Sequence, residues 1–180
     1  MACELTISGR TLPCRNALGG VKAVWIGTTA HTGAGYWNAI SGTSGEVSDT
    51  ATSKTFNDFL SPKNSSSFSQ TVNASNENGT VFYTQTLSLV LNKIAAADIG
   101  VLENMGKGRL AVVIEDVNGN YFVMGHTNGA ELTGGSVTTG TALGDLNGFT
   151  LELTAEEPDA APLIPLDGNG DPDTTNANFA

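Results

Sequence analysis

The sequence predicts a mainly β fold, either a β-sandwich or an open barrel, with about eight strands and one helix. Two observations predict it. The chain of 180 residues holds 22 glycines, while charged residues make up only 14%, against a usual share of about 25%. This composition favours strands and turns over surface helices, which normally carry many Lys and Glu. In addition, only one segment has apolar residues at helical spacing.

The segment GTVFYTQTLSLVLNK, residues 79–93, has the clearest pattern. Apolar side chains occupy one parity: Val81, Tyr83, Leu87, Leu89 and Leu91. The other parity is polar: Thr84, Thr86, Ser88 and Asn92. This alternation predicts a strand longer than the usual 5–6 or so residues, with one apolar and one hydroxyl-rich face.

The remaining elements follow from similar patterns. The helix is predicted over 94–108, because Ile94, Ala97, Val101 and Met105 recur at helical spacing before a Gly-Lys-Gly stop. A hairpin over 109–126 turns at Asn118–Gly119–Asn120. Further strands are predicted at 20–28, 36–40, 54–60 and 67–74. A last strand is predicted where Phe149, Leu151 and Leu153 are in phase, and it is closed by Glu156, Glu157 and Pro158.

The length fits one domain. We expect this domain to span 1–160, with an irregular amino-terminal arm at 1–19. Residues 161–180 hold three of the six prolines together with Asp and Asn, and no period is visible there. That segment is predicted to be a carboxyl-terminal tail.

The net charge of −10 argues against some partners. Tight nucleic-acid binding needs a basic patch, and anionic membrane surfaces also attract basic segments. No apolar run reaches the length of a transmembrane helix, and the first residues lack the features of a signal peptide. We therefore expect no membrane partner.

No metal site is expected. Cys3 and Cys14 are predicted to be free thiols in a reducing compartment, although later oxidation could cross-link copies. His31 and His126 lie far from them in sequence. In DGNGDPD, residues 167–173, the residues Asp167, Asn169 and Asp171 alternate like calcium ligands, but Pro172 and Asn178 stand where a calcium loop needs Gly and Glu.

No catalytic or cofactor-binding residues are expected either, and the chain is predicted not to be an enzyme. His31 or His126 could act as a base, but no nucleophile motif accompanies them. Glu115–Asp116 is interpreted as a solvated turn, and Glu156–Glu157 as a solubilising strand end. The aromatic residues are expected in the core: Trp25, Trp37, Tyr83, Tyr121, Phe122 and Phe149.

Three segments carry a resemblance to a known family. They are CRNALGGVKAVWIG near the amino terminus, SSSFSQTVNASNENGTVFYTQTLSLVLNKI in the centre, and GRLAVVIEDVNGNYFVMGHTNGAELTGGSVTTGTALGDLNGFTLELTAEEPDAAPLI towards the end. Together they span most of residues 14–164. In this order they resemble the bacteriophage tail tube (major tail) proteins, particularly those of phages with Bacteroidetes-like hosts. The regions 29–60 and 165–180 are less similar.

The resemblance implies a virion protein, assembled in the host cytoplasm, whose hexameric rings stack head to tail into a tube. It implies that a long hairpin of each copy joins an inter-subunit barrel around the lumen. The implied partners are other copies, the tape measure protein, terminator and baseplate proteins, and DNA that passes without tight binding. Whether a sheath protein surrounds the tube stays open. Segment 41–65, the arm and the tail are candidates to bridge rings.

Two alternatives stay open. The same fold would serve as the inner tube of a contractile injection or type VI secretion system. In a different class, the chain would be a monomeric ligand-binding β-sandwich.

Overall fold

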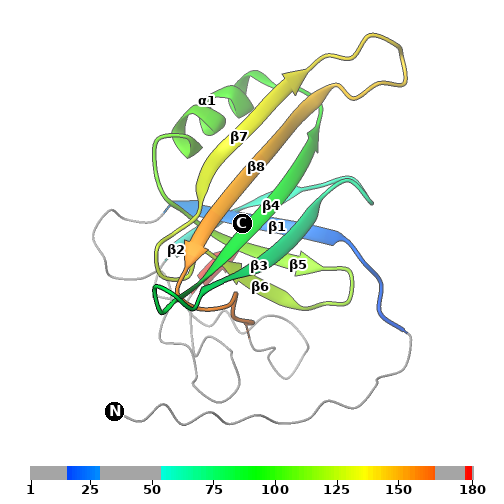
Figure 1. Ribbon diagram of the computed structural model, residues 1–180. Helices are drawn as coiled ribbons and strands as arrows, with labels where there is room; N and C mark the ends of the chain where they lie inside the picture. The colour runs from blue at the N-terminus through cyan, green and yellow to red at the C-terminus, as the bar shows by residue number, and fades with distance from the viewer. Residues whose placement is uncertain (1–15, 29–53, 165–176, 180) are drawn as a thin grey trace.

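The computed structural model describes residues 16–28, 54–164 and 177–179 (Figure 1). The described chain forms two sheets and one helix, which confirms the predicted fold class. The sheets stay separate rather than closing into a barrel. In Figure 1 the strands of the front sheet run across those of the sheet behind it.

The first sheet has the order β6-β5-β1-β2-β9 and the second the order β3-β4-β8-β7. The elements are β1 (Val21–Thr28), β2 (Lys54–Leu60), β3 (Ser67–Ser75), β4 (Thr80–Asn92), α1 (Ala96–Met105), β5 (Leu110–Asp116), β6 (Tyr121–Met124), β7 (Glu131–Thr138), β8 (Gly148–Glu157) and β9 (Ala177–Phe179).

Strand β4 is the long strand predicted over 79–93, and it lies between β3 and β8 with antiparallel pairing on both sides. Leu87 faces Phe68 on β3 and Leu153 on β8. Directly opposite residues of an antiparallel pair point to the same side. The apolar parity of β4 therefore shares one face with apolar residues of its neighbours, and this face packs on the other sheet.

The core between the sheets is built from Leu87 and Leu89 of β4, Leu151 and Leu153 of β8, and inward residues of β1 and β5. Leu87, Leu89 and Leu153 are fully buried. The prediction omitted one member of this face. Gln85 lies at the same parity and is also fully buried.

Strand β5 is buried on both faces of its sheet. All of Leu110–Ile114 is buried. Alternate residues belong to different clusters, with Val112 and Ile114 towards the other sheet and Ala111 and Val113 against Phe56 and Ile164. The expected alternation of Leu110, Val112 and Ile114 thus describes only one of two buried faces.

Two parts of the segment 161–180, which was expected to be a tail, pair with this sheet. The Val123 N–H donates to the Pro162 carbonyl at 2.9 Å, and the Ile164 N–H donates to the Tyr121 carbonyl at 2.9 Å. Ile164 is buried. Strand β9 pairs in parallel with β2.

The remaining differences between the predicted and the observed elements concern β7, the helix and the strand expected at 36–40. Strand β7 was not predicted, because Gly134 and Gly135 interrupt its pattern. It contains a register shift between Leu132 and Gly134. The helix is shorter than predicted, and Leu102 rather than Val101 packs on the core, while Val101 is partly exposed. The strand expected at 36–40 lies outside the described residues.

We predict that Leu89→Ala lowers the free energy of unfolding by ~2–5 kcal/mol, because it leaves a cavity at a fully buried position. Urea denaturation of the monomer would measure this. Ser88→Ala changes the adjacent residue on the outward face and is the matched control, expected to stay within about 0.5 kcal/mol of the unmodified chain. Equal losses in both variants would contradict the assigned faces.

Candidate functional site

The outward face of the β3-β4-β8-β7 sheet is lined mostly by hydroxyl and carboxylate groups, although Phe82 and Val90 of β4 also lie on it, opposite Asn73 and Thr150. Thr84 lies opposite Thr71 and Glu156, and Ser88 lies opposite Ser67 and Glu152. We call this the polar face; its members are Ser67, Ser69, Thr71, Asn73, Thr84, Thr86, Ser88, Glu131, Ser136, Thr150, Glu152, Thr154 and Glu156. The hydroxyl-rich face predicted for β4 alone therefore extends over four strands.

Hydrogen bonds between neighbouring strands hold parts of the polar face. The Asn73 Nδ2 donates to the Thr84 Oγ1 at 2.8 Å. Thr133, the extra residue at the irregularity of β7, contacts the Thr154 Oγ1 at 3.0 Å and donates to the Glu152 carbonyl at 3.2 Å. These contacts order side chains that would otherwise bond only to water.

The charge of the polar face has one sign. Glu131, Glu152 and Glu156 supply carboxylates, and none of the residues defined above as its members is Lys or Arg. The nearest recorded cation is Arg109, whose Nε lies 3.6 Å from the Glu131 Oε1. Such a surface repels phosphate.

Both edges of this sheet carry strands that pair on one side only within the described chain. Strand β3 pairs with β4, and β7 pairs with β8. Unpaired edges present N–H and C=O groups to solvent and can accept another strand. Exposed apolar side chains lie near them, among them Val72 of β3 and Val137 of β7.

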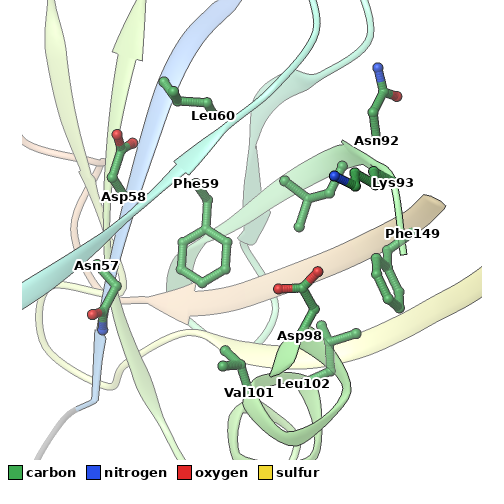
Figure 2. A pocket seen from close by; sticks show the side chains of 11 residues that line it. Asn57, Asp58, Phe59, Leu60, Asn92, Lys93, Asp98, Val101, Leu102 and Phe149 are labelled. Carbon is green, nitrogen blue, oxygen red and sulfur yellow. The ribbon is translucent and has the colours of Figure 1, made fainter. Parts of the chain in front are cut away.

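A groove lies between β2, the end of β4 and α1 (Figure 2). Its volume is about 410 Å³, and its walls include Phe59, Leu91, Leu102 and Phe149. Asp58, Lys93 and Asp98 add charges. An apolar pocket with a few polar groups is the usual form of a small-molecule site.

A buried polar cluster lies where β8 ends. The carboxylate of Glu157 accepts hydrogen bonds from the Thr127 N–H at 3.0 Å and the Asn128 N–H at 2.8 Å. The Gly125 N–H donates to the Gln85 Oε1 at 3.2 Å. Side chains from β4 and β8 therefore hold the turn that follows β6. Burial raises the pKa of the Glu157 carboxyl above its ordinary value, and the N–H groups and His126 only partly offset this.

In each of the pairs Glu115–Asp116 and Glu156–Glu157, one carboxylate that was predicted to be solvated is buried. Glu115 was interpreted as part of a solvated turn, but it is buried and forms an ion pair with Lys22. Glu157 was interpreted as a solubilising residue, and it too is buried, whereas Glu156 is exposed. Neither contact could be read from local sequence, because each partner lies about 30 or more residues away.

Asp116 organises the β5–β6 turn. It accepts bonds from the backbone N–H groups of Asn118 and Asn120 at 2.8 Å and from both of their side-chain amides. Burial acts to raise the pKa of Asp116, but these hydrogen bonds outweigh it and hold the pKa below its ordinary value. They also fix the hairpin predicted at Asn118–Gly119–Asn120.

Of the two candidate histidine bases, only His126 lies in the described part of the chain. His126 has its Nδ1 3.3 Å from the Thr127 Oγ1, and the nearby Glu157 carboxylate bonds backbone N–H groups. Within the described part of the chain, no group of three His, Cys, Asp or Glu could hold a metal ion. Cys3, Cys14, His31, Trp37, Asp167, Asn169, Asp171 and Pro172 lie outside the described residues, and Asn178 lies in β9.

The aromatic residues mostly pack inside. The rings of Trp25 and Tyr121 lie 5.8 Å apart, and those of Phe68 and Phe122 lie 5.7 Å apart. Phe149 is buried and Tyr83 is half-buried. The described residues contain no helix long and apolar enough to cross a membrane.

No protein-family model matches the chain, and no curated protein matches it.

We predict that Glu157 makes stability depend on pH. The folded state holds the Glu157 proton more tightly than the unfolded state, so its contribution to the free energy of unfolding is present below the ordinary pKa of 4.5 and is lost as pH rises through the raised pKa. Glu157→Gln should remove this loss, as measured by thermal unfolding from acidic to neutral pH. Glu156→Gln removes the neighbouring exposed charge and is the control. An unchanged pH profile in Glu157→Gln would contradict the prediction.

Proposed function

We propose that the chain is the subunit of a viral tail tube, a structural virion protein without enzymatic activity. In this proposal its copies form stacked hexameric rings that conduct DNA during ejection. The resemblance of segments within 14–164 to tail tube proteins suggests this function. The observation that carries it is the polar face, whose hydroxyls and carboxylates extend over all four strands of a sheet with two open edges.

The polar face suits the wall of a conduit for DNA. Hydroxyl groups keep the wall wetted, while Glu131, Glu152 and Glu156 repel phosphate. DNA would then slide rather than bind. The opposite face of the same sheet is the core, so each subunit would remain stable with its polar face turned to the lumen.

The open edges suit assembly. If β7 of one copy pairs with β3 of the next, the sheets of a ring join into one continuous barrel, and the exposed edges disappear. Such a contact joins two different surfaces. Heterologous contacts of this kind build rings and filaments. Tape measure, terminator and baseplate proteins would then be the partners inside and at the ends of the tube.

The groove favours a second candidate function. A monomeric sandwich that binds a small apolar ligand would use Phe59, Leu91, Leu102 and Phe149 as its walls. The assembly state separates the two functions, because a tube subunit forms rings and the ligand-binding sandwich stays monomeric.

We predict that the concentrated protein forms rings or tubes, visible by electron microscopy and as a mass far above 18.5 kDa in light scattering. Val72→Lys should leave a folded monomer that does not assemble, because lysine on an edge strand opposes strand addition. Ile99→Lys changes another exposed apolar residue, on α1 and outside both sheets, and is the control. Assembly by Val72→Lys with an unchanged mass would argue against edge pairing through β3.

We also predict that cations on the polar face convert a passive conduit into one that holds DNA. Thr84→Lys combined with Thr150→Lys places two ammonium groups per subunit on this face, one of them opposite Glu156. Assembled tubes of this variant should retain DNA at low salt and release it as salt rises. The matched control is Thr84→Gln with Thr150→Gln. DNA retention by the control, or no retention by the lysine variant, would contradict the proposal that the polar face lines the lumen.

A further inference from the structure

Four Asn–Gly pairs lie in the described chain: Asn78–Gly79, Asn118–Gly119, Asn128–Gly129 and Asn147–Gly148. In such a pair the glycine backbone nitrogen can attack the Asn side-chain carbonyl carbon. A succinimide ring forms and ammonia leaves. Water then opens the ring to aspartate or isoaspartate, so water is the only other reactant. Glycine favours this step because it has no side chain to hinder the turn that the ring requires.

The structure restrains Asn118 at both reacting groups. The Asn118 Oδ1 accepts from the Leu18 N–H at 2.8 Å, and its Nδ2 donates to the Leu18 carbonyl at 2.8 Å. The attacking nitrogen is also engaged, because the Gly119 N–H donates to the Asp116 carbonyl at 3.2 Å. Ring closure at this pair must first break these bonds.

Asn128 and Asn147 are restrained in other ways. The Asn128 Nδ2 donates to the Glu156 carbonyl at 2.7 Å, and the Gly129 N–H bonds to the Glu157 carboxylate. Gly148 is buried at the pairing of β8 with β4, so closely that an added Cβ would lie 2.0 Å from the Leu91 carbonyl oxygen. The Asn147 carbonyl also accepts from the Lys93 N–H at 2.7 Å.

Asn78 differs from these three. It lies in the exposed turn between β3 and β4, and only its backbone N–H has a recorded bond, to the Ser75 Oγ at 3.3 Å. Within the described residues, neither its side-chain amide nor the Gly79 N–H has a recorded hydrogen bond. Gly79 has a φ of +62°, and a Cβ built there would meet nothing within 4 Å. Both reacting groups are therefore free to move.

We propose that Asn78–Gly79 is a spontaneous deamidation site of the folded protein, and that the fold protects the other three pairs. The product places a new carboxylate at the tip of the β3–β4 hairpin, next to Glu77 in the chain and close in sequence to the exposed Val81 and Phe82. Each modified copy becomes more acidic by one charge. The proposal does not depend on the tail tube function.

The test is to incubate the folded full chain in mildly alkaline buffer and follow each Asn–Gly peptide by mass spectrometry. Asn78 should lose its amide at least about tenfold faster than Asn118, Asn128 and Asn147, since each of those must first break hydrogen bonds or leave a buried site. The same chain in denaturant is the control, and there the four pairs should react at similar rates. The Asn169–Gly170 peptide lies outside the described residues and is quantified separately.

A variant checks the assignment. In Asn78→Gln the longer side chain closes a ring less readily, so the fastest of the four reactions should disappear while the other three rates stay unchanged. The proposal is overturned if Asn78 in the folded chain reacts no faster than the three restrained residues. It is also overturned if those residues react as fast in the folded chain as in denaturant.

Discussion

The structure depends on the pairing of β4 between β3 and β8 in a single register. Because side chains alternate, a shift of one residue would bring Leu87 and Leu89 to the solvent and Thr86 and Ser88 into the core. The correct register places leucines of β4 opposite Leu151 and Leu153 of β8 and thereby creates the core. The same register aligns the hydroxyl groups into the polar face, so stability and the proposed lumen wall follow from one constraint.

Much of the fold could be predicted because its strands alternate strongly in sequence. Strand β4, the β5–β6 hairpin and β8 were predicted close to their observed bounds. Strand β7 was missed because glycines and small hydroxyl residues occupy it, and its pairing with β8 is a tertiary effect. Burial of β5 on both faces also escaped prediction, since the covering residues Phe56 and Ile164 come from distant segments.

The candidate site was predictable only in part. The hydroxyl parity of β4 was visible, but its extension across β3, β8 and β7 depends on which strands become neighbours. Glu115 and Glu157 looked like surface residues, because acidic pairs near turns are usually solvated. Their burial is compensated by Lys22 and by the backbone of the turn after β6, respectively, and both contacts arise only in the folded chain.

The number of strands in the β3-β4-β8-β7 sheet has a further consequence. All of its pairings are antiparallel and the count is four, which is even, so the two edge strands run in opposite directions. A second copy brought alongside by rotation about an axis along the strands would therefore set its β3 antiparallel to β7 of the first. The up-and-down alternation would continue from copy to copy without a break. An odd count would instead force a parallel pair at every junction, which is slightly less stable per residue.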